Sequence, residues 1–427
     1  MKYIINEAYQ EGITEIMEKE DFPAIADSTR QGATEKLIEN QIKFQQNLTE
    51  SGDNINVTGS GVANWDPILI NMVRRSAPQL MAFDLAGVQP MSGPNGQVFA
   101  MRSRYTNQTG AEAFVDEANT GFSGTGTQAG DTSGFATDEF GAGDPVAGTA
   151  TGTGMATADA EALGTTSGSP FKEMAFSIEK TSVEAVSRGL RASYSTELAQ
   201  DLRAIHGLNA EQELGNILST EIVSEEDRQL LRTINISAQL GATAGNYDVA
   251  ADSDGRWMVE RWKGLIFQLE LEANAIGINT RRGRANRIIA SSNVASALNM
   301  AGVLEYNPAY AAKLGVDPTG NTYAGMLLGK YAVYIDPYAA VDYVTAGYRG
   351  ANSWDAGIYY CPYVALEMFR SIGEDSYQPS IAFKTRSGIV ANPFAANTSS
   401  GAKAGKGLGQ GENPYYRKFR VQNIAGG

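Results

Sequence analysis

Few residues of this 427-residue chain are of the types that carry out catalysis or bind metals. Its one histidine, His206, precedes a glycine at an expected helix end, and neither an HExxH motif nor a second imidazole accompanies it. A Ser-His-Asp triad would require His206, and the GxSxG motif is absent. We expect a structural role for His206, because a cation suits the C-terminal end of a helix. We therefore predict no catalytic residue, no metal site and no cofactor.

The other candidate residues also favour structural roles. Cys361 is the one cysteine, which excludes an intrachain disulfide, and its apolar, tyrosine-flanked surroundings indicate a core position. Paired carboxylates such as Glu225 and Glu226 are the groups that hydrolyse glycosidic bonds, although on a helix this charged they more often form a solvated face. The loose GxGxxA match at 124–129 has neither a strand before it nor a helix after it, so it does not predict a dinucleotide site.

Composition and charge limit the classes of function. With 42% hydrophobic residues, the chain can bury at least two cores. Lys and Arg number 34 against 48 Asp and Glu, and the net charge of −14 repels phosphate backbones. Acidic residues interrupt the N-terminal stretch where a signal peptide needs an apolar core, and no run approaches the ~18 apolar residues of a membrane span. We expect neither a primary nucleic-acid binder nor a membrane protein.

The elements that position these residues begin with an acidic N-terminal segment. In residues 1–50, Ile, Leu and Met recur at steps of three and four with Glu and Lys between them, which is the pattern of amphipathic helices. Such helices are either solvated or dock on a partner helix. Residues 51–65 are rich in Gly, Asn and Ser without any period, which predicts an extended arm. Asp66 with Pro67 then opens a short helix, which Pro78 ends or kinks.

A long hairpin is predicted to follow. Residues 97–105 and 174–178 alternate between two faces, as strands do. The segment between them has no basic residue from 105 to 171, whereas nine acidic residues and many Gly, Ser, Thr and Ala occur there. An unstructured connection of that length is improbable inside a compact domain. We therefore expect a projecting hairpin arm whose negative charge suits a basic surface.

The second half is predicted to be α+β. A helix over 195–207 is closed by Gly207, and Asn209, paired with Gln212, caps a second helix of about 28 residues and ~40 Å. Residues 256–278 form a strongly amphipathic pattern. Apolar, strand-like segments follow, which are RIIASS, GKYAVYIDPY, DYVTAGY, AGIYYCPYVALEM and SIAFKTRSGIVANPF. This order indicates a mixed sheet with helices against it.

Five segments carry a resemblance to a known family. They are MVRRSAPQLMAFDLAGVQPMSGPNGQVFAMRSRY (72–105), SRGLRASYSTELAQDLRAIHG (187–207), GKYAVYIDPY (329–338), DAGIYYCPYVALEM (355–368) and FKTRSGIVANPF (383–394). In this order they closely resemble the major capsid protein family of T-even-type (T4-like) tailed bacteriophages, along most of residues 66–424. The resemblance thins in the N-terminal segment and over 107–170, which is shorter than the outer domain that the family carries there.

The resemblance implies an HK97-like capsid fold of the α+β class. The implied parts are a scaffold-like N-terminal propeptide (1–50), an N-terminal arm with the first helix (51–92), an extended loop with an acidic Gly/Thr-rich insertion (93–178), a peripheral domain with a long spine helix (179–255), an axial domain (256–375) and a return to the peripheral domain (376–427).

The function implied by the resemblance is self-assembly without catalysis. Subunits would form hexameric capsomers, in which the extended loop lies over a neighbour and the arm crosses a subunit boundary, with interfaces of roughly 1,600 Å² or more. The implied partners are further copies of the chain, a vertex capsid protein, the portal, the scaffold core, a prohead protease, decoration proteins and a host chaperonin. The protein would be made in the host bacterial cytoplasm and would enclose double-stranded DNA in the virion without binding it specifically.

The resemblance also implies proteolytic maturation after Glu in a Leu/Ile-x-Glu pattern. That pattern ends at Glu7, Glu15, Glu18, Glu39, Glu50 and Glu374. A helix rich in Ile and Glu enriches the pattern in any case. However, the occurrence at Leu48, Thr49 and Glu50 is the last in the N-terminal segment, and it precedes Ser51 and Gly52, where an extended chain can enter a protease. The hypothesis is cleavage between Glu50 and Ser51.

Three alternatives remain open at this point. A vertex, pentamer-forming paralogue would have the same fold, and the residues alone distinguish it poorly from the major capsid protein. An acidic glycan-active enzyme would require a cleft with two carboxyl groups at catalytic separation. A surface adhesion module would use residues 107–170 for binding.

Overall fold

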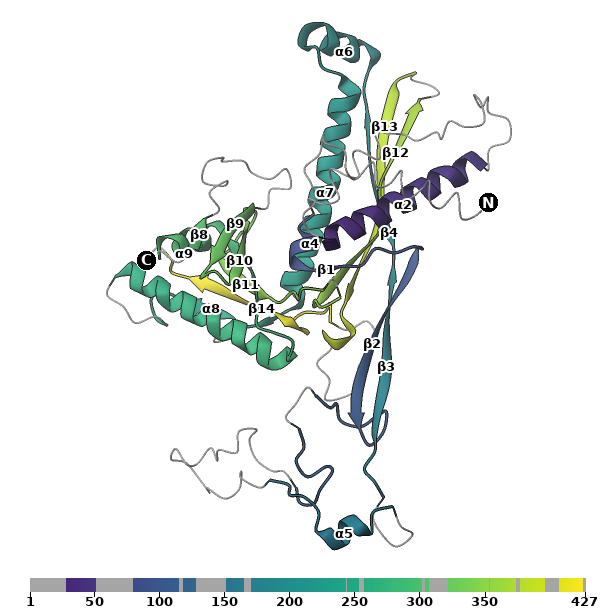
Figure 1. Ribbon diagram of the computed structural model, residues 1–427. Coiled ribbons are helices and arrows are strands. Elements are labelled where there is room, and N and C mark those ends of the chain that lie inside the picture. The colour runs from purple at the N-terminus through teal and green to yellow at the C-terminus, as the bar shows by residue number, and fades with distance from the viewer. Residues whose placement is uncertain are drawn as a thin grey trace. The chain divides into compact units, whose positions relative to one another are not determined.

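The computed structural model describes most of the chain as two compact units (Figure 1). The described residues are 28–50, 80–114, 118–127, 151–164, 170–242, 244–252, 257–301, 304–306, 322–352, 354–373, 377–395 and 407–424. The first unit is made of residues from 1–98 and 181–427, and the second of residues from 99–180. The predicted arm at 51–65 and the helix predicted from Asp66 lie outside the described residues.

The helices of the first unit include those predicted over residues 1–50, 195–207, 209–236 and 256–278, although the apolar residues of the helix at 195–207 are not buried. As far as the chain is described, the helices are α2 (Ser28–Glu50), α4 (Ala82–Leu85), α6 (Thr196–Asp201), the π-helical turn Leu202–His206, α7 (Ala210–Ser237), α8 (Met258–Thr280), α9 (Ser292–Met300) and the 3-10 turn Pro393–Ala395. The amphipathic pattern predicted over 256–278 is confirmed by α8, in which Leu265, Leu269, Ala273 and Ile276 form one fully buried stripe.

The long helix α7 confirms the predicted length with its 28 residues, a span of ~42 Å. Gly207 ends the preceding π-helical turn with φ 68°, a left-handed conformation that glycine adopts without strain, so the predicted stop is confirmed. Asn209 caps α7, and its side chain accepts a hydrogen bond from the backbone nitrogen of Glu211 at 3.1 Å. The sequence indicated Gln212 as the capping partner of Asn209, whereas in the structure the partner is the backbone nitrogen of Glu211.

The smaller sheet of the first unit contains the longest strands. Its order is β1 (Gly87–Val88), β12 (Ile358–Ile372), β13 (Pro379–Ala391) and β4 (Val186–Ser193). β12 and β13 form an antiparallel pair, and β4 is also antiparallel to β13. The short β1 runs parallel to β12. Apolar runs in β12 and β13 predicted these two strands, while the more polar β4 was not anticipated.

The larger sheet is mixed, as predicted. Within the described residues its order is β5 (Ala238–Leu240), β14 (Asn413–Gln422), β11 (Tyr343–Gly347), β7 (Arg287–Ser291), β10 (Tyr331–Asp336), β9 (Thr322–Leu327) and β8 (Leu304–Tyr306), and β6 (Asn246–Asp248) also pairs with β14. β7 and β10 are parallel, and the chain between them contains α9, β8 and β9; most other neighbours are antiparallel.

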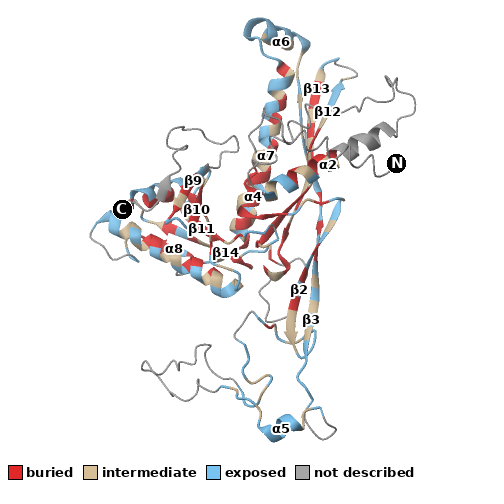
Figure 2. Cartoon of the chain, in the orientation of Figure 1, coloured by how far each residue is buried: buried red, intermediate tan, exposed pale blue. Residues whose placement is uncertain are grey.

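Helices cover both faces of the larger sheet. Successive strand residues point to opposite faces, and Ile288 packs with α8 and α9 while its neighbour Ile289 packs with the C-terminal half of α7. Buried residues therefore concentrate along α8 on one side and at the lower end of α7 on the other (Figure 2). The sheet is the centre of a three-layered core in which α7 also reaches the smaller sheet.

The boundary predicted between an axial and a peripheral domain at residue 375 does not coincide with a change of sheet. β12 precedes that position yet pairs with β13 and β1, while β14 follows it and pairs with β11. The chain crosses to the smaller sheet between β11 and β12, and it returns between β13 and β14. Pairing between segments distant in sequence decides this exchange, and a division into consecutive ranges does not capture it.

Candidate assembly interface

A two-stranded hairpin extends through the second unit. It consists of β2 (Asn95–Tyr105) and β3 (Met174–Glu184), so the predicted hairpin is confirmed. β3 alternates throughout between more buried and more exposed positions, and β2 does so from Asn95 to Arg102, which gives the ribbon two chemically different faces. The same unit contains the short helix α5 (Thr157–Glu161) and a reciprocal backbone pairing of Thr125 with Thr153 at 2.8 Å.

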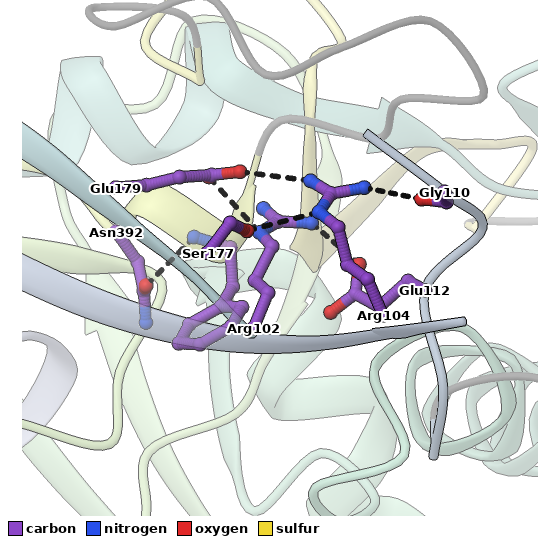
Figure 3. Close-up of polar contacts among 8 residues, drawn as sticks. Arg102, Arg104, Gly110, Glu112, Ser177, Glu179 and Asn392 are labelled. Carbon is purple, nitrogen blue, oxygen red and sulfur yellow. Dashed lines mark hydrogen bonds and ion pairs between the residues drawn. The ribbon is translucent and has the colours of Figure 1, made fainter. Parts of the chain in front are cut away.

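One face of the hairpin carries a cluster of ion pairs, here called the hairpin cluster, formed by Arg102, Arg104, Glu112 and Glu179 (Figure 3). Arg102 is 5% exposed and contacts Glu112 at 2.6 Å and Glu179 at 3.0 Å. Arg104 contacts the other carboxylate oxygen of Glu179 at 3.1 Å and donates to the hydroxyl of Ser177 at 2.9 Å. One carboxylate thus bridges two guanidinium groups, which cancels their mutual repulsion.

The hairpin cluster also holds the turn that follows β2. Arg104 donates to the carbonyl oxygen of Gly110 at 2.9 Å, and the Arg102 partner Glu112 lies in an isolated bridge with Arg104. Backbone hydrogen bonds from Ala113 to Ser103 and from Thr106 to the Glu173 carbonyl close the same turn. Since an isolated two-stranded ribbon is only marginally stable in water, we expect this cluster to contribute to keeping the hairpin formed.

We expect Glu179→Ala to loosen this turn. The change leaves the guanidinium of buried Arg102 with one carboxylate partner, and breaking a buried ion pair typically costs about 3 kcal/mol or more. Amide hydrogen exchange over 99–113 should rise by at least an order of magnitude, while exchange in α8 stays unchanged. The matched control is Glu173→Ala, which removes an exposed carboxylate next to β3. Equal exchange in the two variants would contradict a structural role for the cluster.

The opposite face of the hairpin is apolar and exposed. Its residues are Phe99, Met101, Met174, Phe176 and Ile178, each between 52% and 66% exposed. This arrangement inverts the usual one, because charge is buried on one face while large apolar side chains meet water on the other. A contiguous exposed apolar surface on a folded protein marks a surface that binds another molecule. We call these five residues the apolar hairpin face.

The family of the chain is decided by comparison with known proteins. The family model described as "Major capsid protein Gp23" matches residues 62–421. The chain belongs to the Gp23 major capsid protein family. It is 45% identical to the major capsid protein of Salmonella phage ViI, with 99% of each chain covered, and 37% identical to that of Enterobacteria phage T4, with 96% of this chain and 97% of the relative covered.

The similarity to solved structures and to a capsid vertex protein is lower. The capsid of Myoviridae phage XM1 matches 88% of this chain and 97% of its own at 9% identity with a TM-score of 0.41, and the capsid of an empty GTA particle gives 11% identity and a TM-score of 0.38. The capsid vertex protein of T4 is 27% identical over 53% of this chain. This Gp23 family member is accordingly a major capsid protein of tailed phages, its helices and mixed sheets are those of the predicted α+β class, and the vertex alternative is less supported.

The residues predicted for proteolytic maturation are only partly described. The backbone of Leu48, Thr49 and Glu50 forms the last turn of α2, and Ser51 lies outside the described residues. The prediction of cleavage between Glu50 and Ser51 therefore stays a prediction. Helix α2 confirms a helix within residues 1–50, where the apolar spacing predicts one.

The remaining candidates have structural environments. Cys361 is buried in β12, which confirms the predicted core position. Burial raises the pKa of its thiol to about 12. His206 lies exposed at the end of the π-helical turn, as predicted. No group of three or more His, Cys, Asp or Glu side chains in the described part of the chain is arranged to hold a metal ion. No helix among the described residues is long and apolar enough to cross a membrane.

The expected solvated face at Glu225 and Glu226 is wrong for Glu226. Its carboxylate is 6% exposed and accepts hydrogen bonds from the hydroxyl groups of Tyr360 at 2.6 Å, Ser387 at 2.9 Å and Thr385 at 3.0 Å. Burial is the largest influence and raises the pKa of Glu226, although all three hydrogen bonds act in the opposite direction. The buried carboxylate joins α7 to β12 and β13. Its three hydroxyl partners are distant in sequence, so no local pattern could have revealed it.

Proposed function

We propose that the chain assembles as hexameric capsomers in which a neighbouring copy covers the apolar hairpin face. The observation that carries this proposal is the exposure of five large apolar side chains on one face of β2 and β3. Burying one such side chain stabilises a contact by ~1.5–3 kcal/mol. In a closed ring every subunit makes the same contact with the next, so the gain is repeated around the capsomer.

The hairpin cluster supports this role by shaping the ribbon before it docks. Arg102, Arg104 and Glu179 hold both strands together on the face opposite to the apolar hairpin face. A preformed ribbon loses less conformational entropy when a partner covers it, and this strengthens association. The hairpin is in this proposal the extended loop of the capsid fold, α7 is the spine helix, and the larger sheet with α8 belongs to the axial domain.

The shell would involve further partners in this proposal. They are a vertex capsid protein, the portal, the scaffold core, the prohead protease, decoration proteins and a host chaperonin, with synthesis in the host bacterial cytoplasm. The chain has no enzymatic role here and encloses double-stranded DNA without binding it specifically, to which its net charge of −14 contributes.

Site-specific photo-crosslinking tests the hexameric contact. A benzophenone amino acid at position 176 should yield covalent species of two to six chains on a denaturing gel after irradiation of assembled particles. The same probe at position 263, on an exposed residue of α8 outside the hairpin, is the matched comparison. A result with only monomers at 176, from particles that are intact by electron microscopy, would rule out the proposed contact.

We further propose that a prohead protease cuts between Glu50 and Ser51 during maturation. Proteases bind their substrates as extended chains, so the last turn of α2 has to unwind first. The last turn of α2 contains no basic residue, and Glu50 adds a negative charge at the negative end of the helix dipole, which weakens that turn by about 0.3–1 kcal/mol. Helix ends also open more readily than helix centres.

Glu50→Gln is expected to block this cleavage. The variant removes the carboxylate at which the Leu/Ile-x-Glu pattern ends, and it leaves the helix backbone intact. N-terminal sequencing of chains from purified particles should find Ser51 first in the parent protein and an uncut N-terminal segment in the variant. Glu39→Gln, at another occurrence of the pattern, should not prevent cutting before Ser51. Particles of Glu50→Gln whose chains still start at Ser51 would refute the assignment.

A further inference from the structure

Helix α2 belongs to the segment proposed for removal, yet it completes the core of the first unit. Leu37 and Ile38 are at most 2% exposed. They pack against a surface from α7, β12 and β13, here called the α2 seat, which comprises Leu218, Ile222, Leu366, Ile381 and Phe383. Without α2, these five side chains would lose their cover on one side. The amphipathic pattern in the sequence is therefore that of a docked helix.

Residues beside the α2 seat make polar contacts with the helix. The amide nitrogen of Asn40 donates to the carbonyl oxygens of Met91 at 2.8 Å and Tyr363 at 3.1 Å. The Tyr363 carbonyl is available because the register of β12 against β13 shifts between Pro362 and Val364. At the other end of the contact, the guanidinium of Arg30 pairs with Asp84 and lies over the ring of Phe83, 5.7 Å from its centroid. The contact thus has an apolar centre between two polar anchors.

The fit contains one imperfection. Gln41 is 4% exposed, and its side-chain oxygen has no hydrogen-bond partner among the described residues. Burying an acceptor without a donor weakens a contact. Leucine at this position would fill a similar volume without that penalty. The seat therefore holds α2 less tightly than its apolar contacts allow.

Helix α2 is held by side chains and not by a short connection. In the sequence, 29 residues separate Glu50 from Leu80. Because α2 and the seat are parts of one chain, this connection acts as a tether that keeps α2 near the seat at an effective concentration above that of a free peptide. Cutting the tether removes this local concentration but leaves the contacts themselves unchanged. Held in this way, α2 resembles a ligand that is covalently attached to its receptor.

We propose that the α2 seat is a helix-binding site whose ligand is residues 28–50, and that it binds this helix as a separate peptide when the tether no longer holds it. The proposal does not depend on hexamer formation. It rests on the proposed cleavage only for its consequence, which is that the cut segment stays bound until dilution or competition removes it. The seat then becomes an uncovered apolar surface of the mature subunit.

Binding of a labelled synthetic peptide of residues 28–50 tests the proposal in unassembled full-length chains. The chain variant Leu37→Asp/Ile38→Asp should release its own α2 and vacate the seat. Fluorescence anisotropy should show that the peptide binds this variant at least ~100-fold more tightly than the parent chain, whose own helix competes from within the same chain. Equal or absent binding to the two chains would overturn the proposal, provided that circular dichroism shows the variant to be folded.

Peptide variants supply matched controls. The Leu37→Asp/Ile38→Asp peptide should lose at least ~100-fold in affinity, since each buried aliphatic side chain contributes a factor of about 10 to 100. Lys36→Asp changes an exposed position of α2 and should bind like the parent peptide. Gln41→Leu should bind more tightly than the parent peptide. If the Lys36→Asp peptide lost as much affinity as the Leu37→Asp/Ile38→Asp peptide, affinity would depend on peptide charge and not on the buried positions, and this would contradict recognition by the seat.

Hydrogen exchange of the parent chain gives a test that needs no variant. Amides of residues 30–41 should exchange through a local opening, with protection at least ~100-fold below that of the buried part of α7, because α2 can leave while α7 stays folded. Equal protection of α2 and α7 would show that both open only when the whole unit unfolds, and it would overturn the idea of a separable ligand. Neither measurement involves cleavage or shells, so its failure is distinct from failure of the proposed function.

Discussion

A chain with Met101→Asp and Phe176→Asp is expected to fold as a subunit and to form no shells. Both side chains are exposed in the subunit, at 66% and 57%, so folding does not depend on their burial. In the proposed capsomer both are covered. Each change then removes ~1.5–3 kcal/mol of apolar burial and places a carboxylate where its desolvation costs several kcal/mol more. In a closed ring this loss is repeated at every contact, so we expect assembly to fail.

Sedimentation velocity and negative-stain electron microscopy distinguish the outcomes of this experiment. The double aspartate variant should sediment as subunits, whereas the matched variant Met101→Leu/Phe176→Leu should still assemble because it keeps the face apolar. Far-ultraviolet circular dichroism and hydrogen exchange over the hairpin cluster establish that both variants keep the hairpin. Normal shells from the aspartate variant would contradict the assembly role of the apolar hairpin face.

Glu226→Ala is expected to destabilise the subunit by about 3 kcal/mol. The change removes the acceptor of the buried Tyr360 hydroxyl and of the half-buried Ser387 hydroxyl, and a buried donor without a partner costs roughly 1–3 kcal/mol. Thr385 keeps a second contact with the carbonyl of Val364, so its loss is smaller. Urea unfolding of unassembled subunits measures the effect. Glu225→Ala is the control, because that partly exposed carboxylate makes one ion pair with Arg188.

Glu226→Gln should change the pH dependence of the same stability. Burial raises the pKa of Glu226 in the folded state above its ordinary value of 4.5. Below the ordinary pKa both states are protonated, and stability does not depend on this group. As pH rises from there towards the folded-state pKa, the unfolded chain releases the proton and the folded chain retains it, so stability falls; above the folded-state pKa it is constant.

Glutamine cannot titrate, so the variant lacks this decline. Unfolding free energies of both proteins between pH 4.5 and pH 8 should show the parent losing stability relative to the variant as pH rises. A parent protein that gains stability relative to the variant over this interval would indicate that the hydrogen bonds from Tyr360, Thr385 and Ser387 outweigh burial.

Local sequence patterns predicted much of the fold. The apolar spacing of α7 and α8 follows from one residue every 3.6 positions facing the core, and the alternation in β2 and β3 follows from side chains that point to opposite faces. The stop at Gly207 follows from its left-handed backbone. The long motifs resemble a capsid family, and the comparison over residues 62–421 established that family.

The candidate interface was predictable only in part. The sequence indicated a hairpin and the alternation of its residues, but it did not show that the apolar face is exposed and the charged face covered. That inversion depends on Glu179, which reaches Arg102 and Arg104 from a position distant in the chain, and on the turn near Gly110 that Arg104 holds. The polar β4 was missed for a similar reason, since its partner β13 lies almost 200 residues away in sequence.

The sequence by itself determined the family, the absence of a recognisable catalytic motif, and the types of most helices and strands, because these depend on residues close together in the chain. Tertiary structure alone decided the sheet exchange of β12 and β14, the burial of Glu226, and the docking of α2 through Leu37 and Ile38. Each of these depends on which distant segments supply hydrogen-bond partners and cover apolar surface, and that is fixed only when the whole chain packs.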